Sequence, residues 1–130
     1  MRQSNYLVTD ESGKETLDNN RPFDWNQPIV KGEHIYATGA VYEGEWFGGM
    51  RHGKGSMKWP DGSHFEGTWS YNSAYGHGIY IQSNGGQYSG NWARNNWNGK
   101  GIYLNREGGQ YKGKWENNEK HGHGVETWPG

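Results

Sequence analysis

The sequence predicts an all-β fold built of consecutive β-hairpins, and three observations predict it. A five-residue pattern of aromatic residue, glycine and tryptophan recurs every 23 residues, a Gly-x-Gly element keeps the same step, and glycine-containing turn signals separate the copies. Self-similarity at a fixed period is the signature of a repeat architecture. Only 30% of the 130 residues are hydrophobic, whereas 23 are glycine, 8 tryptophan and 9 tyrosine. We therefore expect a core made mostly of aromatic rings and glycine backbone.

The first strand of each hairpin carries the five-residue pattern. Its copies begin at residues 42, 65, 88 and 111 without an insertion. Within a copy the aromatic residue, the glycine and the tryptophan stand two residues apart, which is the period of a strand and not of a helix. The repeat positions to which we assign a structural role are Tyr42, Gly44, Trp46, Phe65, Gly67, Trp69, Tyr88, Gly90, Trp92, Tyr111, Gly113 and Trp115.

The second strand of each hairpin carries the Gly-x-Gly element, as in Gly53-Lys54-Gly55. Between the two strands we expect a loop of six residues such as 116–121. The next copy follows a turn such as Pro60-Asp61-Gly62, where a positive φ favours glycine. Glycine weakens strands, so its fixed positions need a reason. If Gly44, Gly53 and Gly55 share the face of the rings, their missing Cβ atoms let the rings lie flat on the backbone.

The pattern Tyr-x-Gly-x-Trp, a short loop and His-Gly-x-Gly resembles the MORN repeat (membrane occupation and recognition nexus). Four copies span residues 42–124, with Phe65 in place of tyrosine and with Tyr75 and Asn98 in place of histidine. The resemblance implies an elongated, open-edged, single antiparallel sheet of successive hairpins. Such modules occur in radial-spoke-head proteins of cilia, junctophilins, phosphatidylinositol-phosphate kinases and a SET-domain methyltransferase, so the fold alone does not choose a function.

The chain divides into an N-terminal extension and a repeat domain. Residues 1–31 contain the Pro- and aromatic-rich stretch 21–28, which suits an irregular cap over the first hairpin. Residues 32–130 form the MORN-repeat domain, with a half repeat at 32–41 and full repeats starting at 42, 65, 88 and 111. The last strand has no successor in the sequence and is expected to leave an open edge for a partner.

No residue set points to catalysis, a cofactor or a metal. The chain has no cysteine. Residues 48–55 approach a phosphate-binding loop, but Gly55 stands where serine or threonine binds magnesium, and no helix follows. We expect His52, His121 and His123 to serve the structure. The net charge of −1 lacks the basic excess of nucleic-acid binders.

Two surfaces are candidates for partner binding. On the face opposite the rings, alternation predicts a contiguous apolar strip of Ile79, Ile81, Ile102 and Leu104. Two alternatives remain open: the N-terminal segment covers the strip, or a bulge shifts the side-chain parity. On the ring face, Trp59, Tyr80, Trp97 and Tyr103 could hold an extended or helical peptide.

The functional hypothesis is a non-catalytic scaffold that mediates protein–protein interaction, through a sheet face, the open C-terminal edge or a homodimer. The resemblance implies a cytoskeletal or ciliary assembly as its setting. Two alternatives remain: a module that docks on phosphoinositide membranes, which the charge count weakens, and a regulatory repeat domain of a lipid kinase or methyltransferase. No apolar stretch has the length of a signal peptide or a membrane span, so we expect a cytoplasmic location.

Overall fold

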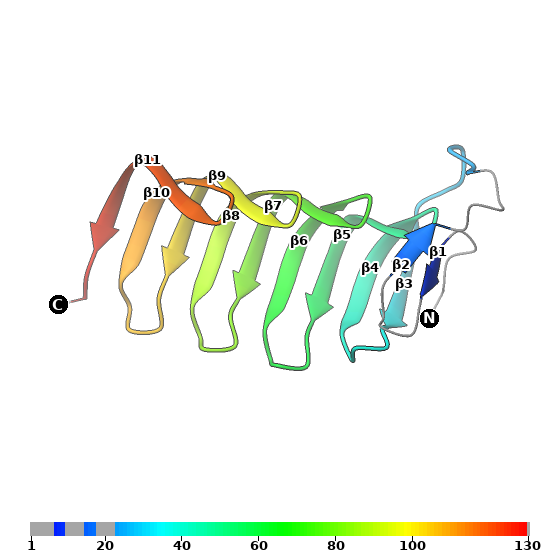
Figure 1. Ribbon diagram of the computed structural model, residues 1–130, viewed down its shortest axis with the longest axis horizontal. Coiled ribbons are helices and arrows are strands. Elements are labelled where there is room, and N and C mark those ends of the chain that lie inside the picture. Colours follow the sequence, from blue (N-terminus) through cyan, green and yellow to red (C-terminus); the bar gives the residue numbers. More distant parts are fainter. Residues whose placement is uncertain (1–6, 10–14, 18–22, 130) are drawn as a thin grey trace.

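A single open sheet of nine antiparallel strands dominates the molecule. The computed structural model describes residues 7–9, 15–17 and 23–129. Neighbours in sequence are neighbours in the sheet, in the order β11-β10-β9-β8-β7-β6-β5-β4-β3 (Figure 1). The strands are β3 (Val30–Ile35), β4 (Val41–Phe47), β5 (Met50–Lys58), β6 (His64–Ser70), β7 (Ser73–Ile81), β8 (Gln87–Ala93), β9 (Asn96–Leu104), β10 (Gln110–Glu116) and β11 (Glu119–Thr127). The predicted all-β fold of consecutive hairpins is confirmed.

The N-terminal extension lies partly outside the described residues. Within it, β1 (Leu7–Thr9) and β2 (Glu15–Leu17) pair with each other in a separate two-stranded ribbon. The segment 23–29 contacts the end of β4 in space: the rings of Phe23 and Trp25 lie 5.7 and 6.2 Å from the ring of Phe47. None of the described residues forms a helix that could span a membrane.

One glycine from every strand of the sheet lies in a single row. The pairing joins Gly32 to Gly44, Gly44 to Gly55 and so on across the sheet. The remaining members are Gly67, Gly78, Gly90, Gly101, Gly113 and Gly124. We call these nine residues the glycine row.

The glycine row makes room for the aromatic core. A Cβ atom on Gly55 would overlap the ring of Tyr42, and one on Gly101 would overlap the ring of Tyr88. The tyrosine hydroxyl then reaches past the glycine, so that Tyr88 Oη donates a hydrogen bond of 2.8 Å to the carbonyl of Asn91. Burial raises the pKa of Tyr88 to about 12, because the charged phenolate would lose its hydration.

The four repeat tryptophans pack on the rings and also donate hydrogen bonds to carbonyl groups of the glycine row. Trp92 Nε1 donates a hydrogen bond of 3.0 Å to the carbonyl of Gly78, fourteen residues earlier in the chain. Trp46, Trp69 and Trp115 make the same bond to Gly32, Gly55 and Gly101. Each tryptophan also meets the ring four residues before it edge-on, at 4.7 to 5.4 Å. Consecutive strands are thereby joined by ring packing and by one hydrogen bond from each tryptophan side chain.

The two glycines of each Gly-x-Gly element serve different purposes, which corrects the expectation that both accommodate rings. Gly55 faces Tyr42, but a Cβ atom on Gly53 would meet the Glu45 side chain instead. Gly53 has a φ of 98° and lies where the pairing of β4 with β5 slips between Gly44 and Trp46. It is therefore required by a β-bulge, since positive φ is costly for other residues.

The turn inside each hairpin has two residues, so the expected six-residue loop is wrong. Asn117 and Asn118 have φ values of 49° and 70°, and the strands continue on both sides of them. Positive φ at both positions is the mark of a type I′ turn, whose twist matches that of the flanking strands.

In the last three copies the second residue of the two-residue turn is an asparagine that also binds the preceding hairpin. The Asn95 side-chain oxygen accepts a hydrogen bond of 2.7 Å from the Ala74 amide, and the Asn95 amide donates one of 3.1 Å to the Ala74 carbonyl. Asn72 clasps Arg51 in the same way, and Asn118 clasps Trp97. We call these paired bonds the asparagine clasps.

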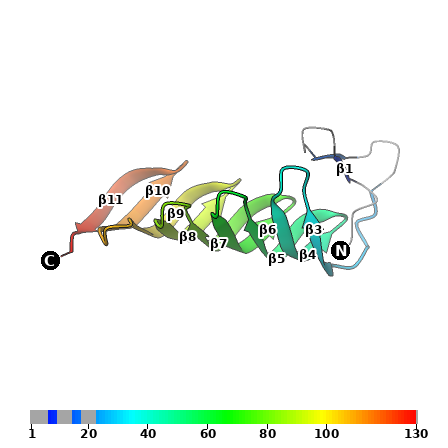
Figure 2. The ribbon, with the colours of Figure 1, turned by 90° about the horizontal axis from the view of Figure 1, so that it is seen from below.

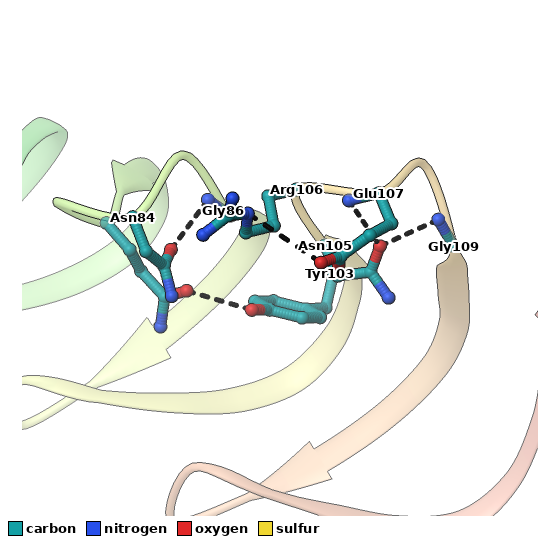
Figure 3. A network of polar contacts seen from close by, with 8 residues as sticks. Asn84, Gly86, Tyr103, Asn105, Arg106, Glu107 and Gly109 are labelled. Atoms are coloured by element: carbon teal, nitrogen blue, oxygen red, sulfur yellow. Dashed lines mark hydrogen bonds and ion pairs between the residues drawn. The ribbon is translucent and has the colours of Figure 1, made fainter.

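The two-residue turns lie along one long edge of the sheet, and the turns between copies lie along the other (Figure 1). Each contains a glycine with a φ between 91° and 97°, at Gly39, Gly62, Gly85 and Gly108. Asparagine side chains close two of these turns by accepting hydrogen bonds from backbone amides, as Figure 3 shows for Asn84 with Gly86 and for Asn105 with Gly109. In the same view Tyr103 Oη donates a hydrogen bond of 2.8 Å to Gln82 Oε1 of the preceding turn.

Candidate interaction surfaces

The sheet is a single layer over most of its length, so both faces are available for contact (Figure 2). One face carries the rings, and we call it the aromatic face. The other carries the alternate side chains, and we call it the polar face. The candidate residues Ile79, Ile81, Ile102 and Leu104 lie on the polar face, since their pairing partners include Glu66 and Ser89.

The apolar strip on the polar face is not contiguous. Across the sheet, Ser89 lies between Ile79 and Ile102, and Gln87 lies between Ile81 and Leu104. The strip is therefore two isoleucine-containing pairs, one on β7 and one on β9, separated by the polar strand β8. Strand parity therefore predicts the correct face for the four side chains, but the polar strand β8 separates them into two groups.

Of the two alternatives for this strip, the parity shift is wrong. The bulge of the second hairpin lies between Gly67 and Trp69, and the pairing is regular from Gly78 to Ile81. Ile79 is 39% exposed, while Ile81, Ile102 and Leu104 are half-buried. Phe23 and Trp25 of the N-terminal extension pack at the end of β4, and residues 1–6, 10–14 and 18–22 lie outside the described part of the chain.

A groove of about 1120 Å³ runs along the polar face over β3 to β7. Its acidic lining residues are Glu33, Glu43, Glu45 and Glu66, and its basic ones include Lys31 and Lys54. Glu45 is already engaged, because its Oε1 accepts a hydrogen bond of 2.7 Å from the Lys54 amide. Glycines of the glycine row form part of the lining, and Ile79 stands at the β7 end. With four glutamates against two lysines, the groove has a small excess of negative charge, and Ile79 gives it an apolar end.

The far end of the polar face has the opposite charge. Lys100, Lys112 and Lys114 are exposed on β9 and β10, where Lys100 pairs with Lys114 and Ile102 with Lys112. Glutamates therefore outnumber lysines in the groove, whereas β9 and β10 carry three exposed lysines on the same face, although the net charge of the chain is only −1.

The aromatic face brings together three of its four candidate residues in one pocket of about 430 Å³. Trp59, Tyr80 and Trp97 line it, together with the buried rings of Phe65, Trp69 and Trp92. Trp59 is 36% exposed. The fourth candidate, Tyr103, lies on the far side of Trp97, with 5.4 Å between the ring centres, in a neighbouring hollow of about 340 Å³.

The last strand is open along one edge. β11 pairs with β10 alone, and all of its residues are exposed. Its side chains interact within the hairpin: Lys120 Nζ lies 2.6 Å from Glu126 Oε1, and His121 Nδ1 lies 3.1 Å from Glu116 Oε2. Among the described residues, no group of three or more acidic or histidine side chains is arranged to hold a metal ion.

These features define a class of protein: an open, single-layer array of β-hairpins with a ring core, whose free faces are suited to contact. Comparison with known families agrees, since residues 42–64, 65–87, 88–110 and 111–130 each match the MORN repeat. The chain belongs to the MORN-repeat family. The family matches are to this repeat, and no catalytic domain is detected.

A short segment also resembles a much longer protein. Over 22 residues the chain is 68% identical to the ALS2 C-terminal-like protein of Bos taurus. The matched segment is 17% of this chain and 2% of that relative. The likeness is confined to about one repeat length.

Proposed function

We propose that this protein is a non-catalytic scaffold that binds a basic, amphipathic segment of another protein in the groove of the polar face. The observation that carries the proposal is the acidic groove ending at the exposed Ile79. Lysine and arginine side chains of a partner would lie along Glu33, Glu43 and Glu66, and an apolar side chain would cover Ile79.

The two parts of the groove make different contributions to binding. Exposed ion pairs are worth about 0–1 kcal/mol each and are screened by salt, so the glutamates set orientation and association rate more than affinity. Burial of apolar surface at Ile79 and Ile81 would provide the anchor. The glycine lining has no side chains to hold a partner away from the backbone, which suits an extended or helical segment.

A pair of synthetic peptides tests the proposal. The probe is a 20-residue amphipathic peptide of lysine and leucine, and its control has glutamate in place of lysine. We expect the basic peptide to bind, measured by isothermal titration calorimetry, and to bind more weakly as salt is raised. Equal binding of the two peptides would overturn the proposal.

Matched variants connect that binding to the groove. Ile79→Ser introduces the residue that the first repeat carries at the same position, Ser56, so the fold should tolerate it. We expect Ile79→Ser to weaken binding about tenfold, a change of 1.4 kcal/mol, and Glu66→Lys to weaken it about threefold and mainly through a slower association rate. Lys112→Glu, at the basic end of the same face, is the control and should not weaken it. Binding that is indifferent to all three variants would place the contact elsewhere.

The basic end of the polar face favours a second candidate, docking on an anionic membrane. Lys100, Lys112 and Lys114 lie beside Ile102, but each lysine near such a surface contributes only about 1 kcal/mol. We expect no flotation with phosphoinositide-containing vesicles at physiological salt. Flotation that Lys112→Glu abolishes would put membrane docking first.

The wider setting is also part of the proposal. A cytoplasmic location and a cytoskeletal or ciliary assembly are supported by the family resemblance alone. The open edge of β11 supports strand addition by a partner or by a second copy of the chain. A role as the regulatory repeat region of a larger enzyme has the support of the relatives that carry such modules.

A further inference from the structure

The pocket on the aromatic face exists because one repeat position is small. The residue that follows the two-residue turn by two positions is Arg51, Ala74, Trp97 or Lys120 in the four copies. These residues pair with the repeat tryptophans, Ala74 with Trp69 and Trp97 with Trp92. In the third copy Trp97 stacks flat on Tyr88, with ring centres 4.5 Å apart and planes 5° apart. In the second copy the alanine leaves that volume unfilled, and the pocket of about 430 Å³ lies there.

The walls of this pocket are aromatic rings set nearly at right angles. Trp59 and Tyr80 lie 6.0 Å apart with their planes at 81°, and Tyr80 and Trp92 lie 6.1 Å apart at 84°. Crossed rings of this kind form ridges and slots into which a puckered, non-planar side chain can insert. The volume falls within the range typical of ligand pockets, about 300–1,000 Å³.

Most of the unused polar groups around the pocket are hydrogen-bond donors, although the Tyr80 hydroxyl can also accept. The repeat tryptophans give their indole N–H groups to glycine carbonyls. By contrast, the indole N–H groups of Trp59 and Trp97 and the hydroxyl of Tyr80 have no partner in the part of the chain that the structure describes. The Asn95 side-chain oxygen is occupied by the Ala74 amide, which leaves its NH₂ group as a further donor.

A lining of rings and donors matches one kind of peptide particularly well. Proline residues have no backbone N–H, so a proline-rich segment presents carbonyl acceptors and no donors. Such segments adopt the polyproline II helix before binding, and domains that recognise it do so with aromatic-lined grooves. An ordinary extended peptide would instead bring backbone N–H groups for which this lining has few acceptors.

We propose that the pocket around Ala74 binds a proline-rich segment of a partner protein in the polyproline II conformation. The site lies on the face opposite the acidic groove, so it is independent of the function proposed above. A partner could engage both faces, or two partners could bind at once.

The test uses the full chain and an acetylated decaproline peptide, with a (Gly-Ser)₅ peptide as the control. We expect saturable binding of decaproline alone, observed by calorimetry and by chemical-shift changes of the Trp59 and Trp97 indole N–H signals. Absence of saturable decaproline binding, or equal binding of both peptides, overturns the proposal.

Ala74→Trp is the decisive variant, because it fills the pocket with the side chain that the third copy already carries at this position. We expect it to keep the wild-type circular dichroism spectrum and melting temperature and to weaken decaproline binding at least tenfold. Tyr80→Phe removes one donor and should weaken binding several-fold. Trp128→Ala, at a residue that is 69% exposed and outside the pocket, should leave it unchanged.

Three outcomes would overturn the proposal at this stage. Decaproline binding that survives Ala74→Trp places the site elsewhere. Loss of decaproline binding in Trp128→Ala would indicate that the peptide binds non-specifically to exposed aromatic rings. A tryptophan-containing peptide without proline that binds more tightly than decaproline, and is lost in Ala74→Trp, would show that the pocket takes an aromatic anchor instead. None of these results bears on peptide binding by the polar face, which Ile79→Ser reports separately.

Discussion

At the scale of single residues, the core depends on glycines, which have no side chain, as much as on the aromatic residues that pack against them. The ring of Tyr88 occupies the space that a Cβ atom on Gly101 would need, and the same holds for Tyr42 with Gly55. The fit is therefore between an aromatic ring and a strip of bare backbone. Such a contact leaves no room for even one added methyl group.

Gly101→Ala tests this fit. We expect it to lower the free energy of unfolding by about 1–3 kcal/mol, because the added methyl group overpacks the site against Tyr88. Urea denaturation followed by tryptophan fluorescence measures the change. Gly62→Ala is the matched control: Gly62 has a φ of 91° but open space around its missing Cβ atom, so its cost of about 1 kcal/mol is backbone strain alone. A smaller cost at Gly101 than at Gly62 would contradict the overpacking account.

The ring contacts could be predicted from the sequence. The different roles of the two glycines in each Gly-x-Gly element could not. Periodicity places Gly53 and Gly55 on one face, and both are invariant across the copies, so the pattern gives them one role. The structure separates them because two extra residues on β5 form a bulge opposite Glu45. A bulge changes backbone conformation without changing the spacing of the motif, so spacing could not reveal it.

At the scale of the hairpin, the two-residue turns of the last three copies do more than reverse the chain. The asparagine at the second turn position reaches back 21 residues and binds both backbone polar groups of a residue in the preceding hairpin. The asparagine clasps therefore act between copies, at the edge of the sheet opposite the glycine-containing turns. The first copy has Gly48 and Gly49 in this turn instead, which keeps the turn geometry without a side chain to clasp.

Two variants of Asn95 separate the contribution of its side-chain hydrogen bond from that of its left-handed backbone conformation. Asn95→Gly keeps a residue that accepts a φ of 68° and removes only the side-chain hydrogen bond, for an expected loss of about 1 kcal/mol. Asn95→Ala adds the strain of a left-handed alanine, and should cost about 1–2 kcal/mol more. Hydrogen exchange at the Ala74 amide is the direct measurement. Exchange at the wild-type rate in Asn95→Gly would show that the clasp does not protect this amide.

The turns were the element that the sequence interpretation missed. The dipeptides Gly48-Gly49 and Asn117-Asn118 are typical of type I′ turns, yet the sequence interpretation places a loop of six residues, such as 116–121, between the two strands. In the structure the strands continue on both sides of the two turn residues. Turn chemistry was the more reliable signal at this position.

At the scale of the whole molecule, each hairpin contacts only its neighbours. The sheet has no second layer among residues 30–129, and its pairing runs strictly in chain order. Stability should then be a sum of terms for each copy and for each junction. The candidate interaction surfaces could be predicted only in part from the sequence. Strand parity assigns Ile79 and Trp59 to faces, but pockets arise where neighbouring copies differ, as they do at Ala74.

Removing residues 111–130 tests this additivity. The shortened chain loses β10 and β11 but keeps every residue that lines the Ala74 pocket. We expect it to fold, with a urea m-value reduced roughly in proportion to the surface lost, because each copy is stabilised by its neighbours alone. Decaproline binding should be retained. Complete unfolding of the shortened chain would instead indicate cooperativity over the whole sheet.

The unbroken 23-residue step also gives the molecule a unit of length. Each copy adds two strands, and strands lie about 4.8 Å apart, so one copy extends the sheet by about 10 Å. Gain or loss of a single copy would therefore move whatever is bound at one end, relative to whatever is bound at the other, by a fixed increment without altering either contact. The number of repeats therefore sets the distance between the two ends of the sheet in steps of one repeat.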